Sequence, residues 1–161
     1  MADSHVEPNR TMTTAPDSSA SPVSTEELAS PPPHTVWPCV NYTDARAAIR
    51  FLVDVLGFIE RAVYAEPTDD SVVAHAELRW PEGGGVMLGS AGRADSEFSM
   101  LPTGCASVYV VTDDPRTVHA RAIAAGAELV RELREEDYGS LGFSVRDPEG
   151  NIWSFGTYRG E

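Results

Sequence analysis

The chain has 161 residues, of which 42% are hydrophobic, and a formal net charge of −13 at pH 7. This length suits one domain, or two small modules that share a core, and the apolar content is enough to form that core. The charge excludes nucleic acid and anionic membrane surfaces as partners, because both require clustered cations, and no stretch approaches the apolar length of a membrane span.

The first 33 residues differ in composition from the rest of the chain. They are rich in serine and threonine and end in the run Pro31–Pro33. Such a segment cannot bury enough apolar surface to fold, so we expect a disordered tail at 1–33 and a single folded domain at 34–161. The start of the chain lacks the cationic and apolar regions of a signal peptide, and we therefore expect a cytoplasmic protein.

The folded region begins with a strand pattern followed by a helix pattern. Residues 36–42 read as a strand, and residues 44–56 as a helix whose apolar side chains recur at helical spacing. Gly57 is a helix stop, and residues 58–65, 71–80 and 86–89 read as three strands. The turn-forming residues 67–70 and the run Gly83–Gly85 separate these strands. The segment 35–91 is therefore a β-α-β-β-β module.

The same order of elements returns after a polar connection at 91–103. Residues 105–111 read as a strand, Asp114 and Pro115 as a helix start, and residues 116–125 as a helix that stops at Gly126. Strands follow at 128–134, 141–145 and 151–157, the last two joined by a tight turn at 147–150. Thr43-Asp44 precedes Gly57 by the same 13 residues that separate Thr112-Asp113 from Gly126. The segment 104–158 therefore repeats the first module.

A sheet covered by one helix leaves its second face without a partner. That face must either curl around a cavity or pack against another copy of the chain, because a large bare apolar patch is not tolerated. The sequence thus predicts an α+β fold in which two βαβββ modules form a curved mixed sheet around a cup, and it places the function in the cup.

These modules resemble the vicinal oxygen chelate superfamily, which contains glyoxalase I, extradiol dioxygenases and bleomycin-resistance proteins. The resemblance rests on the repeated module, the Thr-Asp entry to each helix, and the closing motif from Asp147 to Asn151. It covers the chain from Thr35 to Tyr158 and implies the glyoxalase/bleomycin-resistance fold.

The metal chemistry of that superfamily is not expected here. The resemblance places its ligand positions at Trp37, Met87, Ser107 and Ser154. None of these side chains is the histidine or carboxylate that a divalent metal requires, and a shift of one residue does not supply one. A displaced site formed by His75, Glu77 and Glu149 is the alternative. We expect no metal and no cofactor.

The cup is instead expected to be lined by aromatic, thioether, thiol and small polar side chains. Period-two alternation along the strands places seven residues on this surface: Trp37, Cys39, Asn41, Met87, Ser107, Tyr109 and Ser154. Such a mixture suits a flat, partly apolar ligand. For Trp37 the alternative is packing at a dimer interface, and for Met87 it is the core. Trp153 and Phe155 are expected in the core, Trp80 at a rim or interface, and Cys39 and Cys105 as free thiols.

These observations favour a metal-independent small-molecule-binding protein. The resemblance implies antibiotic sequestration by a homodimer, and the acidic surface favours a cationic or planar aromatic ligand. The first alternative is an enzyme, either a divergent glyoxalase-like lyase or isomerase or a dioxygenase-related protein that uses the same cup. Such an enzyme would use proton transfer by Tyr109 and His75, or attack by Cys39 on an electrophile, although no catalytic residue is assigned. The second alternative is a non-catalytic interaction module.

Overall fold

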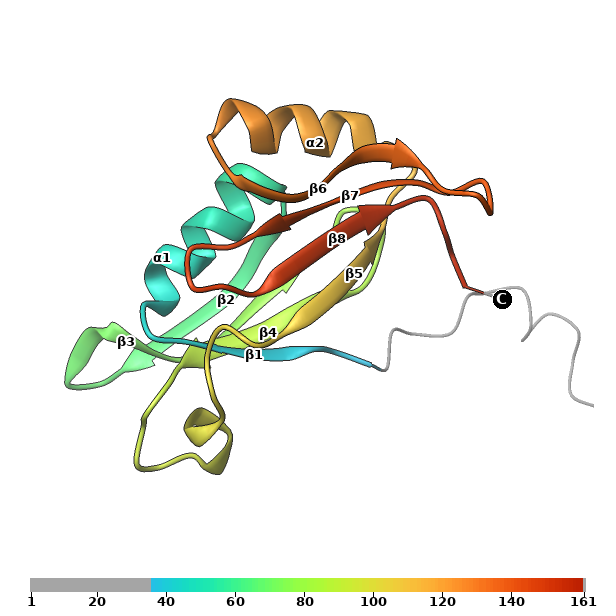
Figure 1. Cartoon of the computed structure of the whole chain (residues 1–161). Helices are drawn as coiled ribbons and strands as arrows, with labels where there is room; N and C mark the ends of the chain where they lie inside the picture. Colours follow the sequence, from blue (N-terminus) through green and yellow to red (C-terminus); the bar gives the residue numbers. More distant parts are fainter. Residues whose placement is uncertain (1–35, 161) are drawn as a thin grey trace, which may run out of the picture. The chain divides into compact units, whose positions relative to one another are not determined.

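The computed structural model describes residues 36–160, so the tail expected at 1–33 lies outside the described residues. Module one contains β1 (Cys39–Tyr42), α1 (Ala45–Arg50), η1 (Phe51–Leu56), β2 (Ile59–Glu66), β3 (Asp69–Arg79) and β4 (Gly85–Ser90). Its four strands form one sheet, sheet A, in the order β1-β4-β3-β2. Strands β1 and β4 pair in parallel, and the other neighbours pair antiparallel (Figure 1).

Module two repeats this arrangement. It contains β5 (Ser107–Val111), α2 (Pro115–Ala124), β6 (Glu128–Glu135), β7 (Leu141–Arg146) and β8 (Ile152–Gly156). These strands form sheet B in the order β5-β8-β7-β6, with β5 and β8 parallel. Between the modules, residues 91–103 contain the short 3-10 helix η2 (Glu97–Met100). The α+β fold with two βαβββ modules is therefore confirmed.

Besides strand ends that are shifted by one to three residues, the elements differ from the sequence prediction in two places. The helix predicted over 44–56 is an α-helix only to Arg50 and continues as the π-helix η1, because side chains spaced three and four apart fit either winding. The turn predicted at 67–70 narrows to Pro67 and Thr68, because Asp69 and Asp70 already belong to β3. Asp114 caps α2 as expected and accepts from the Thr117 amide at 3.0 Å. Asp44, predicted as the first residue of its helix, caps α1 in the same way and accepts from the Ala47 amide at 2.9 Å.

One hydrophobic core serves both modules. The alternate strand residues that face the helices, such as Val40, Leu88 and Val110, are buried in it. Phe58 meets Trp153 with ring centroids 5.6 Å apart, and Trp80 meets Phe155 at 5.5 Å, so aromatic rings of the two modules touch directly. The core position expected for Trp153 and Phe155 is confirmed. The rim position expected for Trp80 is wrong: its ring is buried against Phe58 and Phe155, and its indole nitrogen donates to the Val111 carbonyl at 3.0 Å.

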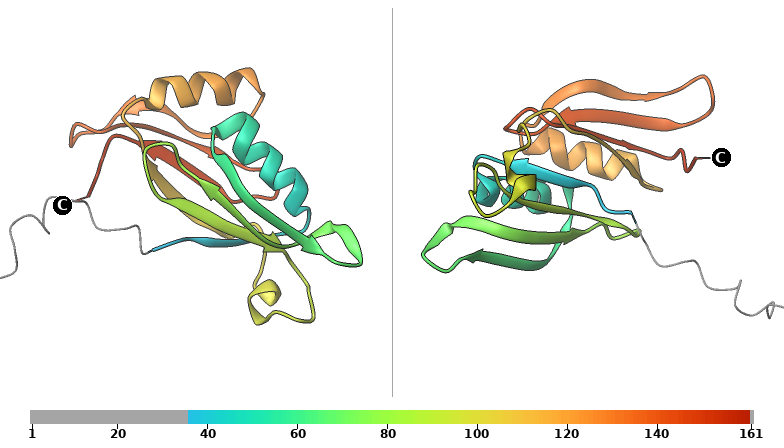
Figure 2. Two further views of the ribbon diagram at one scale, coloured as in Figure 1. Left: turned by 180° about the vertical axis from the view of Figure 1, so that it is seen from behind. Right: turned by 90° about the horizontal axis from the view of Figure 1, so that it is seen from below.

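The helices also meet on this shared side. Arg121 of α2 donates through Nε to the Val55 carbonyl of η1 at 2.9 Å, and its guanidinium also reaches the Leu56 carbonyl. In the view from below in Figure 2, both helices are seen between the green strands of sheet A and the orange-red strands of sheet B. The face of each sheet that turns away from the helices, here called its open face, therefore lies outside the shared core.

Candidate functional site

The open face of sheet A carries three of the predicted ligand contacts side by side. In the strand register Cys39 pairs with Met87 and Met87 with Glu77, while Asn41 pairs with Gly89. Because alternate side chains of a strand point to the same face, these residues share one surface, and their neighbours Val40, Ala76 and Leu88 point into the core. Two neighbouring strands, β1 and β4, thus position Cys39, Asn41 and Met87 together.

These residues line a pocket of about 190 Å³ between the open face and the connecting segment 91–103. The segment lies on the side of the sheet away from α1 (Figure 1). Strand residues form the floor of the pocket, and the segment forms its outer wall. The lining residues are Cys39, Val40, Asn41, Ala74, His75, Met87, Leu88, Gly89, Arg93, Ser96, Phe98 and Ser99.

The polar groups of the pocket lie along β3 and the connecting segment. His75 contacts Glu77 with Nε2 and Oε1 3.2 Å apart, and Tyr64 of β2 stacks on the His75 ring with centroids 6.2 Å apart. The Asn41 amide donates to the Phe98 carbonyl and so joins β1 to the wall. The pocket therefore combines an apolar floor with a few fixed polar groups, which is the usual composition of a small-molecule site.

The open face of sheet B holds the predicted residues of module two. Ser154 and Ser144 form a hydroxyl–hydroxyl hydrogen bond of 2.8 Å, and Ser107 is exposed at the start of β5. The Tyr109 hydroxyl accepts from the Tyr158 amide at 3.1 Å. The Tyr109 ring lies so close to Gly156 that a Cβ there would come within 2.5 Å of the hydroxyl oxygen. This face offers hydroxyls and an exposed phenol ring.

Trp37 and Tyr109 lie outside the pocket of about 190 Å³. The Arg79 guanidinium lies 4.6 Å from the centroid of the Trp37 ring, and that ring covers Gly85. Tyr109 borders a separate cleft of about 330 Å³, which runs between the start of β4 and the edge of β5. One chain therefore brings Cys39, Asn41 and Met87 together, and leaves Trp37, Ser107, Tyr109 and Ser154 elsewhere on its surface.

Sequence reasoning missed the wall of the pocket. Arg93, Ser96, Phe98 and Ser99 come from the polar connection, which has no strand or helix periodicity to indicate which way its side chains point. The one feature of this connection that could have indicated a role in the pocket is Arg93, which is the single cation between Arg79 and Arg116.

The side chains do not fit the divalent metal of a vicinal oxygen chelate centre. Residues 36–160 contain no group of three or more histidine, cysteine, aspartate or glutamate residues placed to hold a metal ion. His75 and Glu77 are adjacent, but both Glu149 oxygens accept backbone amides at the start of α1. The displaced site considered from sequence is therefore not assembled, and the family ligand positions carry indole, thioether and hydroxyl groups, which are poor ligands for such ions.

Comparison with known families now identifies the fold. The family model for the glyoxalase/bleomycin resistance protein/dioxygenase superfamily matches residues 32–155. The chain belongs to this superfamily. Both the repeated module and the closing motif fall within the matched range, so the resemblance seen in the sequence is confirmed.

Solved structures of superfamily proteins are similar along nearly their whole length. TioX from Micromonospora sp. ML1 shares 30% identity with a TM-score of 0.62, and the match covers 76% of this chain and 98% of TioX. A glyoxalase/bleomycin resistance protein from Streptomyces sp. CB03234 shares 20% identity, covering 73% and 94% of the two chains with a TM-score of 0.54. VPC_CASS1, from the mobile metagenome of V. pseudocholerae, shares 19% identity, covering 81% and 98% of the two chains with a TM-score of 0.59. These two support the fold alone.

Two further comparisons are negative. No curated protein matches the chain. Among residues 36–160, no helix is both long enough and apolar enough to cross a membrane.

Proposed function

We propose that this superfamily member binds a small organic molecule in the pocket on the open face of sheet A and needs no metal to do so. The pocket itself carries this proposal, because it places Cys39, Asn41 and Met87 around one cavity of about 190 Å³. An antibiotic is the ligand class that membership beside bleomycin-resistance proteins favours, and sequestration is then the biological role.

Charge favours a cationic or planar aromatic ligand. The chain carries 25 acidic and 12 basic residues, so long-range attraction raises the local concentration of cations. Of the residues that line the pocket, His75 contacts both Glu77 and the ring of Tyr64, so an acidic group and an aromatic surface lie next to the pocket. A flat cation can use both features.

The proposal includes a homodimer. Each open face exposes large side chains: Phe98, Met100 and Leu101 are 75%, 68% and 59% exposed beside sheet A, and Tyr109 is 45% exposed on sheet B. A second copy that placed its sheet B open face over this sheet A pocket would cover these side chains. It would also bring Ser107, Tyr109 and Ser154 to the ligand, so six of the seven predicted contacts, all but Trp37, would meet in one site.

The enzyme alternative loses one of its two candidate chemistries within a single chain. Tyr109 and His75 lie on different sheets and line different cavities, so they do not form a proton-transfer pair. Cys39 and His75 do line one pocket. Turnover of an electrophilic ligand by that pair is the outcome that would favour the enzyme.

The binding test uses the two free thiols as matched reporters. Metal-free bleomycin, a cationic glycopeptide, and ethidium, a planar aromatic cation, are titrated calorimetrically into metal-stripped protein. Alkylation of Cys39 in a Cys105→Ser background places a bulky group in the pocket and should abolish binding. Alkylation of Cys105 in a Cys39→Ser background should leave binding unchanged, because Cys105 lies outside the pocket lining.

Three results would contradict the proposal. The first is no binding of either probe, and the second is binding that survives Cys39 alkylation. The third is elemental analysis of protein purified without chelator that finds a stoichiometric divalent metal, because this would overturn metal independence even if a probe binds.

A further inference from the structure

Strands β3 and β4 separate at the edge of the pocket. The first register pair is Arg79 with Gly85 and the last is Ala76 with Leu88. Pairing stops there, although β4 continues to Ser90 and β3 extends back to Asp69. Beyond this point the backbone of β3 is bound by side chains. The Ser90 hydroxyl accepts from the Val73 amide at 2.9 Å, and Arg93 Nη1 donates to the Val73 carbonyl at 3.4 Å and to the Ala74 carbonyl at 2.5 Å.

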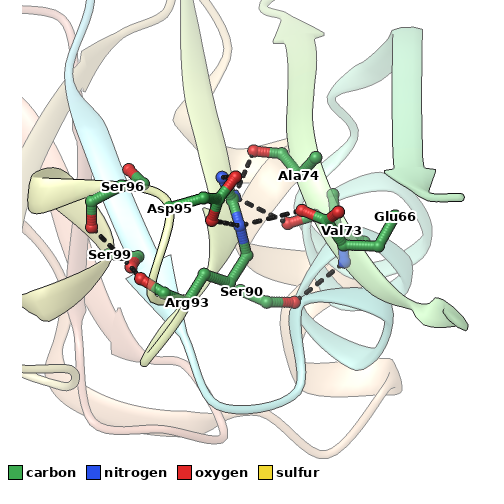
Figure 3. Close-up of polar contacts among 8 residues, drawn as sticks. All are labelled: Glu66, Val73, Ala74, Ser90, Arg93, Asp95, Ser96 and Ser99. Carbon is green, nitrogen blue, oxygen red and sulfur yellow. Dashed lines mark hydrogen bonds and ion pairs between the residues drawn. The ribbon is translucent and has the colours of Figure 1, made fainter. Parts of the chain in front are cut away.

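Arg93 fits this gap because of its surroundings. Gly89 leaves room for the two carbonyl acceptors of Arg93, since a Cβ at Gly89 would lie 3.2 Å from the Ala74 oxygen and 3.3 Å from the Val73 oxygen. Its Nε lies 3.2 Å from Glu66 and 3.2 Å from Asp95, and its side chain is 15% exposed (Figure 3). The Arg93 guanidinium, chiefly through its hydrogen bond, lowers the pKa of the Asp95 carboxyl. One cation therefore joins two carboxylates and two carbonyls.

The backbone of Arg93 holds the pocket wall. The Ser99 hydroxyl donates to the Arg93 carbonyl at 2.7 Å and to the Ser96 carbonyl at 2.8 Å, and the Gly92 amide donates to the Ser99 carbonyl at 2.7 Å. These bonds close residues 92–99 into a compact loop. The Arg93 side chain ties this loop to β3, and the Asn41–Phe98 hydrogen bond ties its far end to β1.

We propose that Arg93 is the positioning residue of the pocket: its guanidinium anchors the wall segment 92–99 to β3 and so sets ligand affinity. This inference rests on the proposed function. Arg93 itself borders the pocket, but its donors are directed to protein acceptors. Its effect on a ligand is therefore the placement of Ser96, Phe98 and Ser99.

The test compares Arg93→Lys with a matched control, Arg134→Lys. Lysine keeps the charge but cannot bond two carboxylates and two carbonyls in fixed directions. Arg134 also pairs with a carboxylate, Glu136, but its side chain is 60% exposed on sheet B. Hydrogen–deuterium exchange at the Gly92, Ser99 and Leu101 amides reports the wall without any ligand. Calorimetric titration with bleomycin or ethidium reports affinity, and thermal unfolding confirms that the fold persists.

In Arg93→Lys we expect faster exchange at the wall amides, unchanged exchange in sheet B, and about tenfold weaker probe binding, comparable to the loss of a charge-assisted hydrogen bond. Arg134→Lys should match the wild type in both measurements. Unchanged exchange at the wall in Arg93→Lys overturns the inference whatever the probes do. Faster exchange with full probe affinity overturns it too, while leaving the proposed function intact. Absence of wild-type probe binding overturns the proposed function, and with it the claim that Arg93 sets affinity.

Discussion

At the scale of single residues, the closing motif organises a buried polar centre. Asp147 is 4% exposed and accepts hydrogen bonds from the Tyr42 hydroxyl at 2.8 Å and from the Trp153 indole at 3.1 Å. The Asn151 side chain and backbone add two donors at 2.9 Å. A buried carboxylate requires such donors, and Tyr42 brings one of them from module one. The motif that marks the family in sequence thus links the modules.

Tyr42→Phe should lower the free energy of unfolding by about 1–3 kcal/mol, because the Asp147 carboxylate loses a buried donor. Burial, followed by the charge and hydrogen bond of Asp147, raises the pKa of the Tyr42 phenol well above its ordinary 10.0. Above about pH 10 the unfolded chain loses this proton while the folded chain keeps it, so wild-type stability should fall with rising pH. The chain contains no lysine, which simplifies this pH range.

Urea unfolding of the wild type and Tyr42→Phe between pH 7 and pH 11 measures both effects. Tyr138→Phe is the control because Tyr138 is 69% exposed. The alkaline fall should be smaller in Tyr42→Phe and unchanged in the control. If the free energy of unfolding falls with pH by the same slope in all three proteins, Tyr42 is not the cause of the alkaline loss of stability.

At the scale of elements, each module caps the other through a repeated Pro-Glu-Gly turn. Glu149, in the turn between β7 and β8, accepts from the Thr43 and Asp44 amides at 2.7 Å each. Glu82, in the turn between β3 and β4, accepts from the Thr112 hydroxyl at 2.5 Å and the Asp113 amide at 2.8 Å. Both glutamates therefore satisfy free donors at the entry to a helix of the opposite module. The repeat thus includes its own reciprocal contact.

Glu149→Gln and Glu82→Gln should each reduce the free energy of unfolding by about 1–2 kcal/mol. The glutamine side chain has one acceptor oxygen, which is neutral and therefore bonds its donor more weakly than a carboxylate oxygen. Its NH2 group replaces the second oxygen and repels the other donor. Chemical denaturation measures the loss, with the exposed Glu132→Gln as the control. A loss no larger than in the control would mean that these contacts contribute nothing to module association.

At the scale of the whole molecule, the question is what covers the two open faces. The shared core uses the helix-facing side of both sheets, and several large apolar side chains stay exposed away from it. Met100 is 68% exposed beside sheet A, and Tyr138 is 69% exposed in module two. Apolar exposure of this kind is typical of an interface.

Sedimentation equilibrium should therefore find the wild type at twice the chain mass of 17.3 kDa. Met100→Asp combined with Tyr138→Asp should shift it toward the monomer, because buried unpaired carboxylates oppose association. Arg116→Asp, an exposed change on α2, tests whether added negative charge alone has this effect. A monomeric wild type at micromolar concentration would contradict the homodimer.

The fold was largely predictable because local signals agreed with it. Asp114 caps its helix as expected, and alternation along β8 correctly placed Trp153 and Phe155 in the core. Trp80 was misplaced because a strand-end residue before proline gives no indication of a contact with the other module. Strand alternation correctly placed Cys39, Asn41 and Met87 on one face of sheet A, but it could not indicate which part of that face is enclosed as a pocket. Their role as ligand contacts stays a prediction.

The sequence by itself determined the repeated module and the superfamily, because these depend on residue type and spacing along the chain. Only the tertiary structure decided that the two helices share one core, that the open faces lie outside it, and that Arg93 ties an irregular segment across one of them. Those features depend on contacts between residues far apart in the chain, such as Arg93 with Glu66 and Asn41 with Phe98. The periodicity of apolar and polar residues along the chain does not indicate such contacts.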